Sequence, residues 1–168
     1  MHYDLIASPL GTLLAMADGS HLTSLHFAGE RHAPRLAPDW VLDPDLAVLR
    51  AARLQLGEYF AGVRRSFELP LRPRGTPYQQ RVWALLREIP YGATTSYGAM
   101  AARLGRAGAA RAVGAANGRN PVAIVIPCHR AVGADGALTG YAGGLHRKAA
   151  LLALEGALPG TPGDSVSR

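Results

Sequence analysis

Residues 96–116 read SYGAMAARLGRAGAARAVGAA, and this stretch predicts two short helices joined by a tight turn. Ser96 is a helix-capping residue type and precedes a helical run over residues 97–104. The glycines of Gly105-Arg106-Ala107-Gly108 predict a turn, and a second helix follows over residues 109–116. Two short helices across such a turn are typical of the helix-turn-helix, a motif that binds DNA.

The second helix of this pair carries almost only small side chains. Alanine or glycine fills six of its eight positions, which would let its backbone approach another surface closely. Arg111 is the one large charged residue that projects from it.

Upstream of the pair, Thr76-Pro77 predicts the start of another helix, and Gln79 stands where a capping box requires it. Pro90-Tyr91-Gly92 ends this helix. Its buried stripe is expected at Val82, Leu85, Leu86 and Ile89.

Downstream of the pair, the run Ala123–Ile126 predicts a short buried strand that Pro127 stops. A glycine-rich loop over residues 133–144 follows. The last predicted helix covers residues 145–155 and ends at Gly156.

The first part of the chain predicts strands and one long helix. The helix is expected to begin at Asp43-Pro44 and to end at Gly62. The predicted strands cover residues 3–7, 12–17, 22–27 and 66–69.

The stretch Pro70–Gly75, rich in proline and arginine, predicts a domain boundary. We therefore expect an α/β (α+β) protein in two domains. A strand-rich domain with one long helix would cover residues 1–73, and a mainly helical domain would cover residues 74–158. A flexible tail is expected over residues 159–168.

The composition excludes several classes of protein. The chain has 168 residues, of which 48% are hydrophobic and 18% charged, so it can build a core and is no disordered polyelectrolyte. No apolar run approaches the ~20 residues of a membrane span, and the N-terminus lacks the pattern of an export signal. A single cysteine excludes an internal disulfide and a structural zinc site with two thiolates. We expect a cytoplasmic protein that is no membrane protein and needs no metal or cofactor.

Positive charge is concentrated in the second half of the chain. Residues 1–73 carry seven arginines against eight acids, while residues 74–168 carry ten arginines and Lys148 against four acids. This asymmetry favours a C-terminal half that meets phosphates. An arginine-rich composition is also what a GC-rich genome produces, so charge alone leaves the question open.

Cys128 is the candidate nucleophile. A lone cysteine is usually a small buried hydrophobe, but here His129 and Arg130 follow at once, and positive charge near a thiol lowers its pKa from about 8.5. In an extended segment neighbouring side chains point to opposite faces, so the chain must turn here or a water must bridge the two groups. Among the four acids of this half, Glu155 is the remaining candidate to orient the imidazole.

These residues resemble the active-site signature of the O6-alkylguanine-DNA alkyltransferases. The signature is Pro127-Cys128-His129-Arg130, preceded by Asn120-Pro121 and followed by Gly140-Tyr141-Ala142-Gly143-Gly144. The resemblance runs from about Thr76 to Gly156.

The resemblance implies a function and a role for several residues. Cys128 would accept the alkyl group from O6 of a flipped guanine, or from O4 of thymine, once per protein molecule. His129 would act as base through a bridging water, oriented by Glu155. Tyr97 would donate toward guanine N3, and Asn120 would brace the turn that presents the cysteine.

The resemblance also implies a partner and a fold. The partner would be double-stranded DNA, bound by a monomer through the minor groove, and the N-terminal domain would be ribonuclease-H-like. Arg111 would insert where the damaged nucleotide leaves. The further DNA contacts would be Ser96, Ala110 and Arg130, and the guanine pocket would be lined by Ala131, Tyr141, Ala142 and Gly143.

Two other functions stay open at this point. A cysteine hydrolase could use Cys128, His129 and an acid, but it would turn over repeatedly. A helix-turn-helix regulator without chemistry would make Cys128 incidental.

Overall fold

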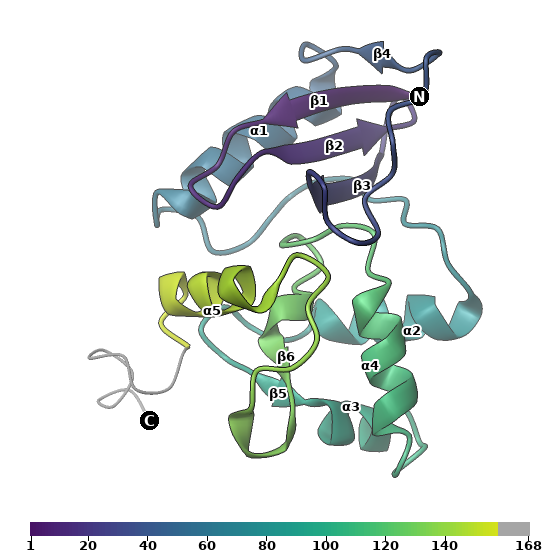
Figure 1. Cartoon of the computed structure of the whole chain (residues 1–168), viewed down its shortest axis with the longest axis vertical. Coiled ribbons are helices and arrows are strands. Elements are labelled where there is room, and N and C mark those ends of the chain that lie inside the picture. Colours follow the sequence, from purple (N-terminus) through teal and green to yellow (C-terminus); the bar gives the residue numbers. More distant parts are fainter. Residues whose placement is uncertain (158–168) are drawn as a thin grey trace. The chain divides into compact units, whose positions relative to one another are not determined.

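The beginning of the chain forms a four-stranded sheet in the computed structural model, which describes residues 1–157 (Figure 1). β1 (His2–Ile6) pairs antiparallel with β2 (Leu13–Ala17), and β2 pairs antiparallel with β3 (Leu22–Phe27). These three strands were predicted from the sequence and are confirmed. β4 (Val41–Leu42) pairs parallel with β1 at the edge, and its two exposed residues gave no sequence signal.

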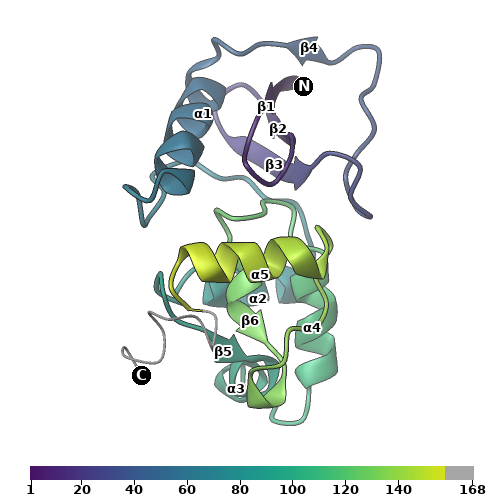
Figure 2. The ribbon, with the colours of Figure 1, turned by 60° about the vertical axis from the view of Figure 1, so that its left-hand side comes forward.

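Helix α1 (Ala47–Phe60) packs against one face of this sheet (Figure 2). Its buried side chains recur at helical spacing, so the apolar stripe faces the strands. The helix begins three residues later than the prediction from Asp43-Pro44, with Leu46 as its N-cap and Ala47 as its first residue. The reason is that the Asp43 carboxylate bonds the His2 ring, at 3.1 Å, and its backbone N–H donates to Tyr3 instead of starting a helix.

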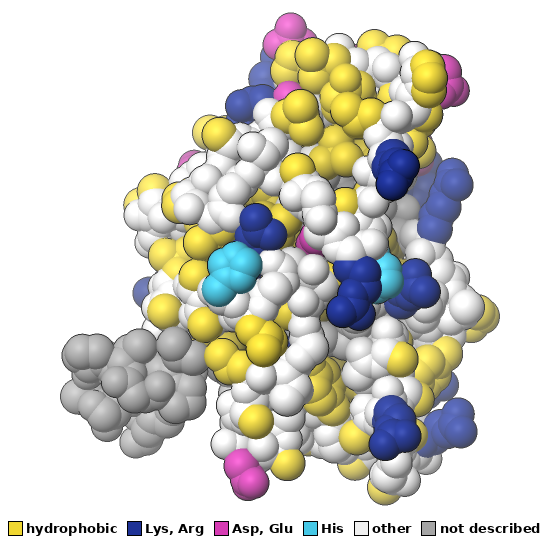
Figure 3. All heavy atoms as spheres, viewed as in Figure 1, with side chains coloured by type: hydrophobic (Ala, Val, Ile, Leu, Met, Phe, Trp, Pro, Cys, Tyr) yellow, Lys and Arg dark blue, Asp and Glu magenta, His cyan; other side chains and the backbone are white. Residues whose placement is uncertain are grey.

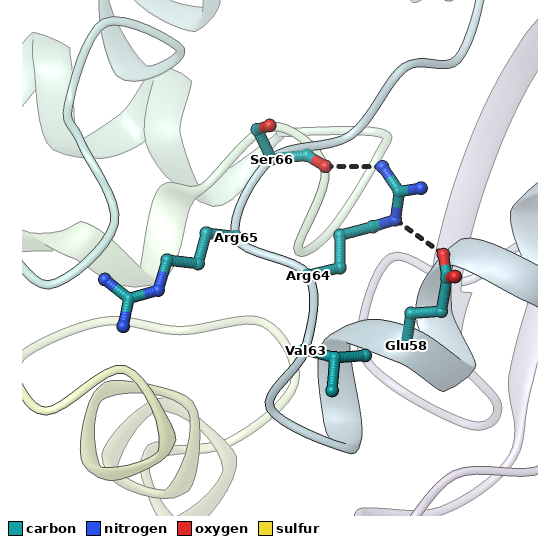
Figure 4. A pocket seen from close by; sticks show the side chains of 5 residues that line it. All are labelled: Glu58, Val63, Arg64, Arg65 and Ser66. Atoms are coloured by element: carbon teal, nitrogen blue, oxygen red, sulfur yellow. Dashed lines mark hydrogen bonds and ion pairs between the residues drawn. The ribbon is translucent and has the colours of Figure 1, made fainter.

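The predicted strand over residues 66–69 is wrong, because side chains of α1 replace the sheet partner that this segment would need. The side-chain amide of Gln55 bonds both the N–H and the carbonyl of Glu68, at 2.8 and 3.0 Å. Arg64 bridges the Glu58 carboxylate and the Ser66 carbonyl, while Arg65 points to the other side (Figure 4). Beyond this segment, Leu71 makes a single bridge to Leu22.

The second part of the chain is mainly helical. It holds α2 (Pro77–Leu86), α3 (Tyr97–Arg103), α4 (Ala110–Gly118) and α5 (Leu145–Leu154). The predicted caps are present: Thr76 forms a full capping box with Gln79, and the Ser96 hydroxyl accepts from the Ala99 N–H. Helices α3 and α4 pack together across their glycine turn, so the predicted helix pair is confirmed. The Trp83 indole N–H donates to the Ala116 carbonyl, at 2.9 Å, and ties α2 to α4.

A two-stranded parallel pair joins distant segments within this part. β5 (Thr95–Ser96) leads directly into α3, and β6 (Ala131–Val132) follows a 3-10 turn over Cys128–Arg130. Each strand has only two residues, which is too short for a sequence pattern. The pair places the start of α3 beside the residues that follow the cysteine.

The predicted strand Ala123–Ile126 is also wrong. Val122 makes one bridge to Leu25, after which the chain turns, with the Val125 N–H donating to the Ala123 carbonyl. Ile124 has a φ of 71°, a backbone conformation that is strained for a β-branched residue. The run is apolar because it is buried, and burial of so short a run does not distinguish a strand from a turn.

The described residues divide into two compact units. The first consists of Met1–Arg74 together with Pro121–Val125, and the second of Gly75–Asn120 and the chain from Ile126 on. The sequence placed Pro121–Val125 in the second domain, whereas these residues group with the first unit. The tail predicted over residues 159–168 lies outside the described residues. Among residues 1–157, no helix has the length and apolar character that crossing a membrane requires.

Candidate active site

Cys128 is the first residue of the 3-10 turn that interrupts the buried run before β6. The chain therefore turns at the cysteine, as one of the two expected arrangements required. Cys128 is buried, with 6% of its surface exposed. Two asparagine amides hold the turn: Asn120 Nδ2 donates to the Ile126 carbonyl at 2.7 Å, and Asn117 Nδ2 donates to the Cys128 carbonyl at 3.4 Å. The sequence analysis named Asn120 but missed Asn117.

His129 and Glu155 lie in contact although 26 positions separate them in the sequence. Glu155 is the C-cap residue of α5, and its Oε2 lies 2.8 Å from Nε2 of His129. Both side chains are completely buried. The structure thus brings together the acid and the imidazole that the sequence analysis paired.

The charge state of Glu155 determines the tautomer of His129. Burial would raise the pKa of Glu155, but the hydrogen bonds from His129 and Arg130 outweigh burial and lower this pKa from 4.5 to about 2. The carboxylate is therefore ionised and can only accept, so Nε2 of His129 carries a proton. Burial lowers the pKa of His129, which keeps the ring neutral. Nδ1 is then left with a lone pair.

Nδ1 of His129 is a buried atom without a hydrogen-bond partner among the residues that the structure describes. A buried polar group is normally paired, so an unpaired one with a free lone pair calls for an explanation. A ring held on one side by a carboxylate and free on the other is the arrangement of a general base.

Arg130, which the sequence analysis expected to contact DNA, lies in the protein interior. Its guanidinium bonds both oxygens of Glu155 at 2.8 and 3.0 Å, and Nη1 donates to the Ile89 carbonyl at 2.7 Å. The guanidinium also lies over the ring of Tyr91, 5.8 Å from its centre. Arg130 therefore helps to hold Glu155 ionised.

Lys148 is the functional candidate that the sequence analysis missed. It lies on α5 and is completely buried, and its amine donates to the carbonyls of Ala131 and Thr139 at 2.6 and 2.9 Å. The same amine lies 3.3 Å from the Tyr97 hydroxyl. A lysine on a helix usually faces solvent; the one available signal was that Lys148 is the only lysine in an arginine-rich chain.

Burial changes the ionisation of both Lys148 and Tyr97. It lowers the pKa of Lys148 from 10.5 to about 8, although attraction to the Cys128 sulfur opposes this shift. Burial also raises the pKa of Tyr97, and the negative charge of Cys128 adds to that shift. The phenol is thus protonated near neutral pH, and its hydroxyl donates to the Thr139 carbonyl at 3.0 Å.

The predicted pocket residues lie on β6 and on the loop before α5. Ala131 is fully buried and its carbonyl binds Lys148, while Tyr141 and Ala142 are half-buried and Gly143 is buried. Gly144 ends the loop with a φ of 98°, a conformation that favours glycine. Lys148 fixes this loop through the Thr139 carbonyl, so one amine joins the loop, β6 and Tyr97.

The three remaining predicted DNA contacts lie at the helix-turn-helix. Ser96 is the N-cap of α3, Ala110 is half-buried, and Arg111 is exposed in the first turn of α4. Arginine and lysine side chains occupy several separate places on the face drawn in Figure 3.

Two family models match the chain and divide it between them. Residues 77–157 match the DNA-binding domain of 6-O-methylguanine DNA methyltransferase, and residues 1–73 match the ribonuclease-like domain of the same family. The second match confirms the expected ribonuclease-like fold of the N-terminal part.

Individual proteins agree with these matches. A "Methylated-DNA--protein-cysteine methyltransferase" of Mycobacterium bovis is 50% identical over 155 residues, which cover 92% of each chain. The protein of the same name from Methanosarcina acetivorans is 46% identical over 156 residues, covering 93% of this chain and 99% of that one. The crystal structure of Mycobacterium tuberculosis OGT in complex with DNA is similar with a TM-score of 0.85 and 48% identity, over 95% of this chain and 96% of that chain.

Proposed function

The chain belongs to the O6-methylguanine DNA methyltransferase family, and from this premise we propose how its residues carry out the reaction. Its activity is direct reversal of DNA damage, in which an alkyl group leaves O6 of guanine for a cysteine of the protein itself. Cys128 is the only cysteine in the chain, so it is the acceptor.

The observation that carries the mechanism is the orientation of His129. Its Nε2–H is fixed on the ionised Glu155, and its Nδ1 has a lone pair without a partner among the described residues. We assign Nδ1 as the base that takes the proton of the Cys128 thiol, through a water as the family resemblance implies. Glu155 stabilises the imidazolium that results, and Arg130 keeps Glu155 ionised.

The transfer forms one bond and breaks one bond. The Cys128 sulfur attacks the alkyl carbon, and the bond between that carbon and O6 breaks with its electron pair going to guanine. The thiol proton passes to His129 and from there to water, and guanine takes up one proton in place of the alkyl group, so one proton is exchanged for one alkyl group overall. The thioether is stable, so each molecule reacts once.

Tyr97 and Lys148 act on the leaving guanine. The protonated Tyr97 phenol can donate a hydrogen bond toward N3 when its O–H turns from the Thr139 carbonyl to the base, and this bond makes guanine a better leaving group. Lys148 is a positioning residue, because it fixes Tyr97 and the carbonyls of Ala131 and Thr139 at once. Tyr141, Ala142 and Gly143 belong to the loop that it holds, and we propose that they line the guanine pocket.

Duplex DNA is the substrate, so the base must leave the stack before a buried sulfur can reach it. We propose that Arg111 fills the vacated space, supported by its exposure among small residues at the start of α4. An Arg111→Ala variant should then react slowly with duplex DNA and normally with free O6-benzylguanine. Equal loss on both substrates would overturn this role.

We also propose that residues 74–158 form the catalytic and DNA-binding domain, that residues 1–73 form the second domain, and that the protein works in the cytoplasm. The family boundaries at residues 73 and 77 support this division. A reactive thiol needs a reducing compartment, which supports the location.

Mass spectrometry after reaction with excess O6-methylguanine duplex tests the function. We expect the addition of one methyl group, located on Cys128, and then no further reaction. Cys128→Ser should bind the duplex without transfer, because an alcohol is a far poorer nucleophile near neutral pH. Repeated turnover would indicate a hydrolase, and binding without any alkyl uptake would indicate a regulator.

A further inference from the structure

The sheet of the N-terminal unit has a second face that α1, the helix of this unit, does not cover. α1 packs on one side of the strands, and the connection between β3 and β4, residues 28–40, passes on the other side (Figure 2). Ser24 and His26 of β3 alternate with Leu25, and Ser24 pairs with Met16 of β2. A pocket of about 370 Å³ lies at these residues and at the connection. This volume is at the lower end of the range of small-molecule sites.

One buried polar atom in this pocket has no partner. The hydroxyl of Ser24 forms no hydrogen bond with any residue between positions 1 and 157, although Ser24 is only 9% exposed. The neighbouring Thr23 shows the usual solution, since its hydroxyl donates to the Met16 carbonyl at 3.2 Å. A buried hydroxyl without a bond costs free energy. The Ser24 oxygen has almost no exposed surface of its own, so a ligand in the pocket can bond it once the side chain rotates toward the pocket.

His26 lines the same pocket and is oriented from behind. Its Nδ1 lies 2.6 Å from the Glu30 carboxylate, and both side chains are nearly buried. The ring is therefore fixed, and no described residue bonds its Nε2. Ser24 and His26 together offer a hydroxyl and a ring nitrogen on one sheet face.

The walls of the pocket suit a flat ring. The apolar residues that line the pocket are Trp40, Met1, Met16, Pro34 and Pro121. Aromatic and thioether groups pack favourably on the face of an aromatic ring. These apolar walls around two polar groups are typical of a site for a small heterocycle.

A free cation stands beside these walls. Arg74 lines the pocket and is exposed, and no residue in the described part of the chain bonds its guanidinium. The contrast is Arg72, two positions earlier, whose guanidinium pairs with Asp18. A guanidinium that is not engaged in the protein is suited to bind a phosphate. Metal binding does not explain the cluster, because residues 1–157 contain no group of three ligands that could hold an ion.

We propose that this pocket binds a nucleoside monophosphate, with the base against Trp40, a base nitrogen or oxygen bonded to the Ser24 hydroxyl, and the phosphate at Arg74. The site is separate from the reaction at Cys128, because all of its lining residues belong to the N-terminal unit.

Calorimetric titration of the full-length protein with dGMP, dAMP, dCMP and dTMP tests the proposal. Inorganic phosphate and deoxyribose 5-phosphate serve as probes without a base. We expect saturable binding of at least one nucleotide and much weaker binding of the two base-free probes. Equal binding of phosphate alone, or no binding of any nucleotide at millimolar concentration, would overturn the proposal.

Variants distinguish a ligand-binding site from a cavity that binds no ligand. Ser24→Ala should weaken nucleotide binding about fivefold. The same variant should leave thermal stability unchanged or raise it, because it removes an unbonded buried hydroxyl. Arg74→Gln should weaken binding and reduce its dependence on salt, while the control Arg72→Gln should bind like the wild type. Ser24→Ala that binds normally would show that the hydroxyl does not face the ligand.

Two further measurements separate this site from the guanine pocket at Cys128. Trp40→Phe should remove the nucleotide-dependent change in tryptophan fluorescence, since Trp83, the other tryptophan, is buried in the second unit. Protein already alkylated on Cys128 by free O6-benzylguanine should bind the nucleotide unchanged. Loss of binding after alkylation would assign the nucleotide to the catalytic pocket and overturn the proposal.

Discussion

Two charged groups, Asp4 with Arg53 in the N-terminal unit and Glu155 with its partners in the C-terminal unit, are buried in different ways. In the N-terminal unit, Asp4 is buried and bonds Arg53 of α1 at 2.6 Å, but nearly half of the Arg53 side chain is exposed. In the C-terminal unit, Glu155 bonds His129 and Arg130, and all three side chains are buried. The first pair keeps one partner in water, whereas the second group loses water on every side.

The difference in burial indicates the role of each charged group. A half-exposed ion pair costs little and joins a helix to a sheet. Complete burial of several charges is costly and brings stability only through excellent geometry, so its retention points to chemistry. The buried group of Glu155 and Arg130 sets the tautomer of His129, whereas the pair of Asp4 and Arg53 fixes the position of α1 on the sheet.

The largest expected effect comes from removing the charge of one carboxylate in each unit. Glu155→Gln should lower the free energy of unfolding by about 3 to 5 kcal/mol, because Arg130 is left buried without a counter-charge. It should also slow alkyl transfer by roughly 10² to 10⁴-fold, because His129 loses its orientation. Asp4→Asn is the matched change in the other unit and should cost about 1 kcal/mol with no effect on transfer.

Chemical denaturation and single-turnover rates, measured on the same preparations, check both expectations. If Glu155→Gln does not fold, the rate can be measured on His129→Gln, which keeps the Glu155–Arg130 pair. A transfer rate equal to that of the wild type in a folded variant of either residue would show that the buried contact between Glu155 and His129 does not serve the reaction.

Acid should affect the two units unequally. The pKa of Glu155 is about 2 in the folded protein and 4.5 ordinarily, so its contribution is complete above about pH 5 and is lost as the pH falls toward 2. For a buried carboxylate this difference in pKa corresponds to about 3 kcal/mol. His129 acts in the same direction, since burial lowers its pKa and the unfolded chain takes up the proton first below about pH 6.5.

Asp18 of the N-terminal unit provides the comparison. Its pKa is also lowered to about 2, first by the hydrogen bond from the His21 backbone and further by Arg72, but it lies in an exposed turn. Salt should therefore weaken the contribution of Asp18 and leave that of Glu155 nearly unchanged. Denaturation midpoints of wild type, Glu155→Gln and Asp18→Asn at pH 3.5 and 7, each at low and high salt, measure both. Equal salt dependence of the two variants would contradict the assignment.

Local signals in the sequence predicted the parts of the fold that local interactions determine. The caps at Thr76 and Ser96 and the helix-turn-helix were readable because capping is an interaction between near neighbours. The strands over residues 66–69 and 123–126 failed for the opposite reason. In the first case the backbone partner is the Gln55 side chain, which no local pattern can show.

The active-site residues also differ in whether a local sequence signal revealed them. Cys128, His129 and Arg130 were visible as neighbours, and Glu155 was found by elimination among four acids. Arg130 was assigned to DNA from the family resemblance, and Lys148 was overlooked because lysines are usually exposed. Both are buried against carbonyls of distant segments, so only the tertiary fold reveals them.

Removing the charge of Lys148 should have a moderate effect. Lys148→Met deprives the carbonyls of Ala131 and Thr139 of their donor, so the pocket loop and Tyr97 are held less firmly. We expect transfer to O6-methylguanine DNA to slow roughly 10- to 100-fold, an effect of about 1 to 3 kcal/mol on the barrier.

The pH profile distinguishes this positioning role from a loss of stability. Lys148 has a pKa of about 8 and loses its charge above that pH, so the wild-type rate should fall there. Lys148→Met lacks the titrating amine and should show no such fall. If the variant is slow and its rate still falls near pH 8, the group that titrates there is a residue other than Lys148.

The smallest expected effect is the difference in DNA affinity between variants of two helix caps within the C-terminal unit. Thr76 and Ser96 each accept one hydrogen bond from a backbone N–H, at 3.1 and 3.0 Å, so replacing either with alanine should cost about 1 kcal/mol of stability. Thr76 begins α2, a helix that carries none of the proposed DNA contacts, whereas Ser96 directly precedes Tyr97 and α3. If Ser96 also contacts the duplex, Ser96→Ala should weaken DNA binding several-fold beyond Thr76→Ala at equal stability. Equilibrium binding to an unmodified duplex, together with thermal unfolding of both variants, decides the matter. Equal affinities would show that Ser96 only caps α3. The C-terminal unit would then contain polar groups with a purely structural role beside the polar groups that take part in the reaction.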